Sequence, residues 1–144
     1  MSADQTFAEA VRSLAGYMNW DITDAIEDDY AGFSFELSDD NEVDLDFFLN
    51  EERVDIAVAG QAFVESEKDI PDDFSTLLMR RSDDLMYGAW TLAETDTGNL
   101  QYRLLWTLDL EHFARMPKEK LRDLIERMID EVGEVNTLWE EGEY

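Results

Sequence analysis

The chain lacks cysteine entirely and has only one histidine and two prolines among its 144 residues. Without cysteine it can form no disulfide, no thiolate nucleophile and no cysteine-bound zinc site, which favours a cytoplasmic location. The lone imidazole, His112, would have to serve in any histidine-based triad, zinc site or acid–base pair. We interpret His112 as a surface or partly packed residue, and we expect no enzymatic activity, no metal site and no cofactor.

Basic residues are also scarce. The sequence has 11 Lys and Arg against 36 Asp and Glu, a formal net charge of -25 at pH 7. Binding to nucleic acid or to anionic lipid requires a basic patch that neutralises phosphates or headgroups, so we expect neither as a partner. The sequence has no apolar run near the roughly 18 residues of a membrane span, and its first residues lack the pattern of a signal peptide.

Two explanations of the acidity are open. One is adaptation to high intracellular salt, where screening suppresses the self-repulsion of a compact anion. The other is the ordinary acidity of a small adaptor protein. The acids Asp39, Asp40, Glu42, Asp44 and Asp46 crowd one predicted turn and strand. Because their spacing lacks the central glycine and the final glutamate of a calcium loop, we interpret them as a solvated face.

Apolar residues nevertheless make up 44% of the chain, including 8 Phe, 5 Tyr and 4 Trp, which is enough for a hydrophobic core. Apolar side chains at helical spacing predict helices over residues 6–18, 71–86 and 117–139. Thr6 and Glu9 have the spacing of a capping box, so we expect the first helix to begin there.

Alternating apolar and polar residues predict five strands, over residues 33–37, 43–49, 54–58, 88–95 and 100–109. Short polar turns join them, and chains with such hairpin connections form antiparallel sheets. The predicted class is α+β: an antiparallel five-stranded sheet with helices packed on one face, in the order α-β-β-β-α-β-β-α. No linker or repeat divides the sequence, so we expect a single domain over residues 1–144.

Helix 6–18, meander 31–59, helix 71–85, hairpin 88–109 and helix 117–139 together cover nearly the whole chain. Their order and spacing resemble the type III secretion chaperone-like fold, which includes the CesT-like effector chaperones and the YbjN-like proteins. The resemblance implies a small acidic cytoplasmic homodimer that holds an extended segment of a client protein against apolar patches. It also allows a YbjN-like regulatory protein that has no secretion client.

Four aromatic residues are candidates for binding such a partner: Phe48, Phe63, Trp90 and Trp106. Phe48 stands out because its neighbours Phe47 and Leu49 belong to the apolar face of their strand, so Phe48 must point to the acid-bearing side. An aromatic side chain there could anchor a partner. The alternative function is nucleic-acid mimicry, in which ordered carboxylates imitate phosphates and inhibit a DNA-binding protein.

Overall fold

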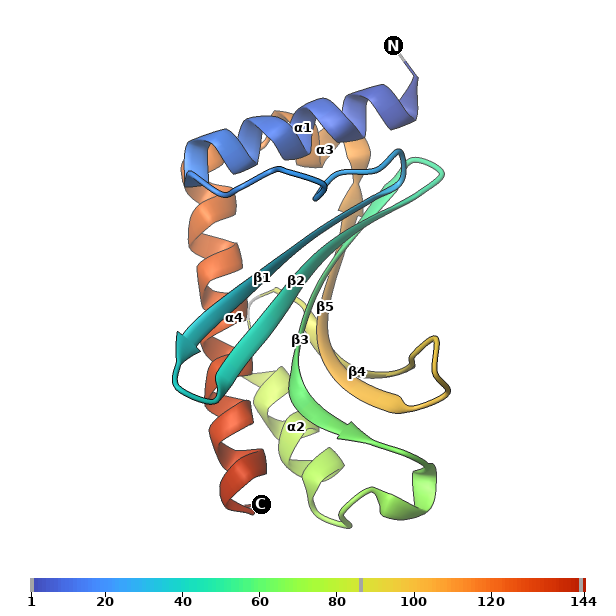
Figure 1. The fold of residues 1–144 in the computed structure, drawn as a ribbon, viewed down its shortest axis with the longest axis vertical. Coiled ribbons are helices and arrows are strands. Elements are labelled where there is room, and N and C mark those ends of the chain that lie inside the picture. Colours follow the sequence, from blue (N-terminus) through green and yellow to red (C-terminus); the bar gives the residue numbers. More distant parts are fainter. Residues whose placement is uncertain (1, 86, 143) are drawn as a thin grey trace.

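A computed structural model describes residues 2–85, 87–142 and 144 (Figure 1). In chain order the elements are α1 (Ala3–Met18), β1 (Tyr30–Ser38), β2 (Asn41–Asn50), β3 (Arg53–Val64), the 3₁₀ helix η1 (Glu67–Asp69), α2 (Phe74–Asp83), β4 (Ala89–Glu94), β5 (Leu100–Asp109), α3 (Leu110–Arg115) and α4 (Lys118–Glu141). The predicted class and element order are confirmed, with η1 and α3 as short additions.

The five strands form one antiparallel sheet in the order β1-β2-β3-β5-β4, so β1 and β4 are its edges. The long helix α4 runs along one side of this sheet, and α1 crosses one of its ends (Figure 1). Helical side chains pack on one sheet face, as the sequence predicts. The opposite face, which we call the open face, has no helix over it among the described residues.

The core lies between the helices and the inward face of the sheet. Alternate residues of β2, namely Val43, Leu45 and Phe47, point into it and are buried. Phe7 of α1 and Ile125 of α4 meet them from the helical side and are fully buried. Burying each such side chain contributes about 1.5–3 kcal/mol, so this layer is the main source of stability.

A buried amide connects α4 to the sheet. Asn136 is 1% exposed, and its side-chain oxygen accepts a 2.8 Å hydrogen bond from the backbone N–H of Gln61. Its side-chain nitrogen donates to the side chain of Asn41 at 2.8 Å and to the carbonyl of Glu42 at 2.9 Å. The absence of a side chain at Gly60 makes room, since a Cβ there would lie 2.0 Å from the Asn136 oxygen.

The start of α1 differs from the prediction. Ser2, not Thr6, is the N-cap, and its hydroxyl accepts a hydrogen bond from the N–H of Gln5 at 3.2 Å. The Gln5 side chain accepts in return from the Ser2 N–H at 3.0 Å, which completes a capping box. Thr6 and Glu9 have the same spacing one turn later, and the helix simply continues through them.

Two other predicted boundaries were wrong. Helix α2 begins at Phe74 because residues 71–73 form a turn. Strand β3 continues to Val64, past an irregularity after Ala59 that interrupts the alternation used to predict it. Near the chain end, the centroid of the Tyr144 ring lies 5.1 Å from that of Phe74.

Candidate partner-binding face

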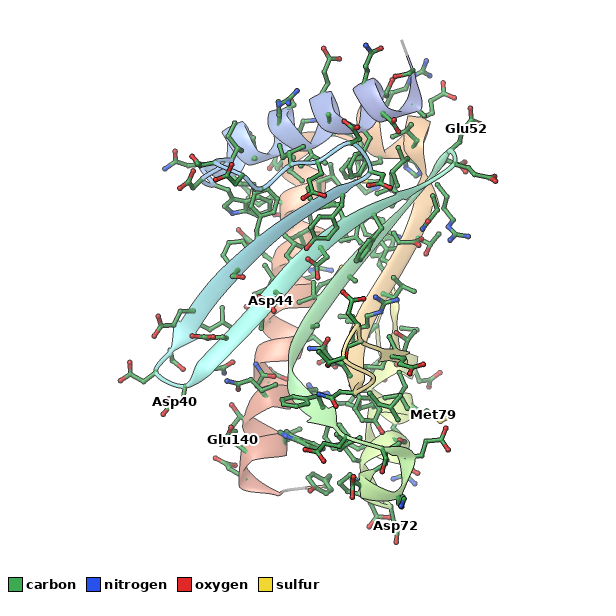
Figure 2. The ribbon with its side chains drawn as sticks, turned by 45° about the vertical axis from the view of Figure 1, so that its right-hand side comes forward. Asp40, Asp44, Glu52, Asp72, Met79 and Glu140 are labelled. Carbon is green, nitrogen blue, oxygen red and sulfur yellow. The ribbon has the colours of Figure 1, made fainter. Side chains whose placement is uncertain are left out.

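Acidic side chains surround the molecule. Figure 2 shows Asp40 at the turn between β1 and β2, Glu52 at the turn between β2 and β3, and Asp72 just before α2. On the open face, the register of β1 and β2 places Ser34 opposite Asp44, and the Ser34 hydroxyl donates to that carboxylate at 2.6 Å. Carboxylates therefore occupy both the ends of the molecule and its uncovered sheet face.

Tyr30 and Asp46 form a hydrogen-bonded pair on the open face. The Tyr30 hydroxyl donates to the Asp46 carboxylate at 2.5 Å. Gly32 lies opposite Asp46, and its missing side chain leaves room for the tyrosine, since a Cβ would lie 2.3 Å from the hydroxyl oxygen. Burial is the main cause that raises the pKa of Asp46, and burial together with the adjacent carboxylate raises the pKa of Tyr30.

Phe48 lies beside this pair, on the acid-bearing side that its alternation predicts. Its ring centroid is 5.3 Å from that of Tyr30. The guanidinium of Arg103 on β5 lies over the Phe48 ring, 6.0 Å from its centroid, a distance at which a cation and an aromatic face attract each other. The open face thus presents a half-buried aromatic ring with a tyrosine on one side and an arginine on the other.

Arg103 has an unusual position for a base in so acidic a chain. Its Nε is buried and finds no hydrogen-bond acceptor among the described residues. It takes part in none of the ion pairs found in that part of the chain, although its charge partly counteracts the raised pKa of Asp46. A guanidinium can donate five hydrogen bonds, so Arg103 retains donors for an incoming acceptor.

These residues line an open groove of about 910 Å³. The groove extends from the β1–β2 side of the open face to the hairpin between β4 and β5, and its lining is Asp29, Tyr30, Asp46, Phe48, Leu49, Asn50, Ala93, Glu94, Thr95, Asp96, Gln101 and Arg103. The lining has four acids and one base, so the groove favours a cationic occupant around its single arginine.

The other predicted aromatic residues lie elsewhere. Phe63 pairs with Gln101 across β3 and β5 and is 51% exposed, near the groove but outside its lining. Trp90 points to the helix-covered face, and its ring N–H donates to Glu131 at 2.8 Å. Trp106 is on that same face and packs 5.5 Å from the ring of Tyr87. Phe48 and Phe63 therefore share the open face, whereas the two tryptophans do not.

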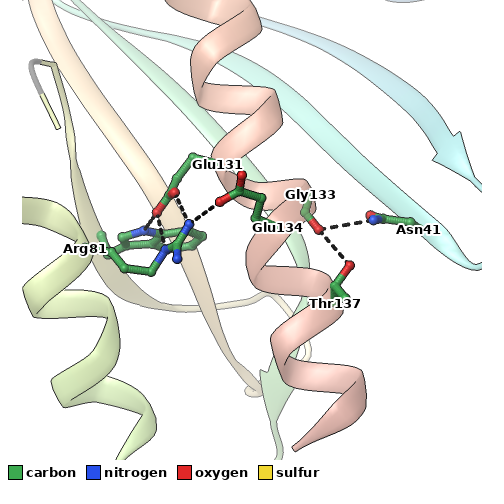
Figure 3. A network of polar contacts seen from close by, with 7 residues as sticks. Asn41, Arg81, Glu131, Gly133, Glu134 and Thr137 are labelled. Carbon is green, nitrogen blue, oxygen red and sulfur yellow. Dashed lines mark hydrogen bonds and ion pairs between the residues drawn. The ribbon is translucent and has the colours of Figure 1, made fainter. Parts of the chain in front are cut away.

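The Trp90 contact belongs to a charged cluster that joins α2, α4 and β4 (Figure 3). Arg81 donates to Glu131 through Nε at 2.9 Å and also reaches Glu134. Figure 3 shows Arg81 reaching from α2 toward both glutamates on α4, while Asn41 contacts the neighbouring turn of that helix. Trp90 thus contacts α4 within the folded chain, and its predicted role in partner binding stays a prediction.

Sequence reasoning found Phe48 because strand alternation gives its direction. Tyr30 and Arg103 were missed. A single arginine at an outward position of a strand is common, and nothing in the sequence shows that it faces an aromatic ring two strands away. The register of β2, β3 and β5 puts Phe48 in one row with Asp55 and Thr107, and Arg103 in another row, opposite Ala59. Only the folded structure shows that the long Arg103 side chain spans these rows and reaches the Phe48 ring.

The described residues contain no group of three or more histidine, cysteine or acidic side chains placed to hold a metal ion. Within the same residues, no helix is both long and apolar enough to span a membrane.

Comparison with known proteins finds similarity at the level of structure. No family model and no curated protein matches the sequence. A chain of the structure described as "Crystal Structure of the ExsC-ExsE Complex" is similar over 96% of this chain and 97% of its own length. The TM-score is 0.56 and the sequence identity is 11%. The likeness establishes a fold like that of the type III secretion chaperones.

Proposed function

We propose that this protein is a non-enzymatic binding module of chaperone type, which holds an extended segment of a client protein on the open face of its sheet. The observation that carries this proposal is the pairing of Phe48 with Arg103 in a groove that no described helix covers. Aromatic and arginine side chains are the types most often responsible for binding energy at protein interfaces.

The lining of the groove indicates the chemistry of the client segment. Asp29, Asp46, Glu94 and Asp96 surround the single base, so a segment with lysine or arginine is favoured over an acidic one. An apolar or aromatic client residue would cover Phe48 and exclude water from it. The Arg103 guanidinium, which forms none of the ion pairs found among the described residues, would then donate to a backbone carbonyl of the segment.

The fold supports this proposal, because the similar structure is described as a complex between two proteins. We further propose a homodimer in the cytoplasm. Met79 of α2 is 74% exposed and Leu92 of β4 is 42% exposed, and a second copy would cover these apolar side chains. The missing cysteines fit a reducing compartment.

Affinity capture that compares three proteins tests the client site. Wild type, Phe48→Ala and the control Ile22→Ala, at an exposed apolar position with no proposed role, would be immobilised and exposed to native lysate at high salt, with bound proteins identified by mass spectrometry. We expect a set of clients that wild type and Ile22→Ala retain and that Phe48→Ala loses. Equal capture by all three would reject the open face as the client site.

The two alternative functions give different results. A YbjN-like regulator would give a partner without secretion function, and a nucleic-acid mimic would displace its partner from DNA in a competition assay.

A further inference from the structure

Strand β5 extends beyond its outer neighbour. Strand β4 pairs with β5 only over Leu100–Leu105. The pairing ends where Ala89, the first residue of β4, lies opposite Leu105. The remaining residues Trp106–Asp109 pair with β3 on their inner side and with no described strand on their outer side. The sheet therefore has a notch four residues long beside the end of β5.

Backbone donors face this notch. The N–H of Leu110 bonds inward to the carbonyl of Glu52 at 2.8 Å. Because backbone groups alternate between the two edges of an extended strand, the N–H groups of Thr107 and Asp109 point outward. Neither finds a hydrogen-bond acceptor among the described residues. Thr107 and Asp109 are both exposed residues, and both line one cavity.

A cavity of about 500 Å³ occupies the notch, within the range of small-molecule sites. Its lining is Arg53, Tyr87, Trp106, Thr107, Leu108, Asp109, His112, Met116 and Lys120. Three of these residues are basic types and one is an acid. In four other cavities of the described chain, acids equal or outnumber bases. Among these five cavities, it is the one whose lining has more basic than acidic residues.

The basic side chains come from three separate elements, since Arg53 begins β3, His112 is in α3 and Lys120 is in α4. Lys120 forms none of the ion pairs found among the described residues, although the chain has 36 acids. Tyr87 and Trp106 form an aromatic wall, with ring centroids 5.5 Å apart. Cations, free N–H groups and a flat apolar wall thus meet in one cavity.

We propose that this cavity binds a small planar organic anion, an aromatic ring that bears a carboxylate or a phosphate. The ring would pack on Trp106 and Tyr87, and the anionic group would accept hydrogen bonds from the Thr107 N–H and from Lys120. Arg53 adds a second positive charge, although it already pairs with Asp55 at 3.1 Å. The site does not depend on client binding, because Phe48 and Arg103 do not line this cavity.

Calorimetric titration with three probes of the same ring tests the proposal. These are 2-naphthoate, 2-naphthyl phosphate and the neutral 2-naphthalenemethanol, each added to the full-length protein. We expect the anions to bind and the alcohol to bind at least about fivefold more weakly, as the loss of one or two exposed ion pairs predicts. The relative affinity of the first two distinguishes a carboxylate ligand from a phosphate ligand.

Variants then locate the site. Lys120→Gln should weaken 2-naphthoate severalfold, whereas Lys118→Gln, which removes the same charge outside the cavity, should leave binding unchanged. Thr107→Pro removes the outward N–H together with the hydroxyl that donates to Asp55 at 2.9 Å, and it should also weaken binding. Thr107→Val loses the same hydroxyl but retains the N–H, so it serves as the control. Circular dichroism confirms that each variant is folded.

Three results would overturn the proposal. The first is that the neutral alcohol binds as tightly as the two anions, and the second is that the two lysine variants have equal effects on binding. The third is that neither anion gives a heat of binding at about 5 mM, a concentration at which a ligand with a millimolar dissociation constant is mostly bound. Tighter binding by an acidic peptide that pairs with the notch as a strand would also replace the small anion as the occupant.

Discussion

The Tyr30 hydroxyl and the Asp46 carboxylate lie 2.5 Å apart across the first two strands, on the face of the sheet that no described helix covers. Their pairing keeps a carboxylate ordered in a partly buried position beside Phe48 and Arg103. Tyr30 therefore fixes the position of one negative charge in the groove, and the raised pKa of Asp46 makes the stability of the fold depend on pH.

Asp46→Asn should change the pH dependence of stability. Burial raises the pKa of Asp46 above its ordinary 3.8, so the folded protein binds more protons than the unfolded one. Stability should fall as pH rises from about 4 through the raised pKa. Urea denaturation at a series of pH values should show this fall in wild type and a smaller one in Asp46→Asn.

Tyr30→Phe provides the matched control. The tyrosine hydrogen bond favours the ionised carboxylate, so its loss should raise the pKa of Asp46 further and extend the fall in stability to higher pH. An unchanged profile in both variants would show that Asp46 does not contribute to the pH dependence.

Phe48→Ala should weaken client binding at least about tenfold while lowering the free energy of unfolding by about 1 kcal/mol, because Phe48 is on the open face. Phe47→Ala is the control from the next position. Phe47 is fully buried, so its loss should cost about 3–5 kcal/mol. Similar melting temperatures for the two variants would contradict the assignment of faces.

Arg81→Ala should destabilise the protein by about 2–3 kcal/mol, because it leaves the largely buried carboxylate of Glu131 without its ion-pair partner. Arg80→Ala removes the same charge from an exposed neighbour and should cost less than about 0.5 kcal/mol. Chemical denaturation of both variants measures the difference. Equal losses would mean that the cluster between α2 and α4 contributes little.

Salt should stabilise the fold. Glu36 and Glu42 lie directly opposite each other on β1 and β2, where like charges are destabilising. The Debye length falls from about 10 Å at 0.1 M salt to about 3 Å at 1 M, so the melting temperature should rise with potassium chloride. Glu36→Lys should raise it at low salt and reduce the salt response. A flat response in wild type would favour the adaptor explanation over a halophilic one.

The proposed homodimer predicts a mass of two chains in light scattering at micromolar concentration. Met79→Lys should shift the protein toward one chain, because it places a charge on the exposed apolar surface of α2. Tyr17→Lys, which places the same charge at an exposed position of α1, is the control and should leave the mass unchanged. A single-chain mass for wild type would reject the dimer.

Periodicity predicted most of this fold. The alternation around Phe47 and Phe48 gave both the core face of β2 and the direction of the candidate anchor, because a strand has only two faces. It could not give Arg103 its neighbours, since those depend on how three strands align. Helix α3 was missed because its six residues are too few for a helical period to be recognised.

Asn136 helps to fix the position of α4 along the sheet. If α4 shifted by one turn along the sheet, its apolar stripe would still meet apolar strands, so hydrophobic contact alone discriminates poorly between these arrangements. The shifted helix would, however, bury an amide away from Gln61 and Glu42, at a cost of about 1–3 kcal/mol for each unpaired group. One polar residue thus raises the energy of near-native alternatives more than it stabilises the native state.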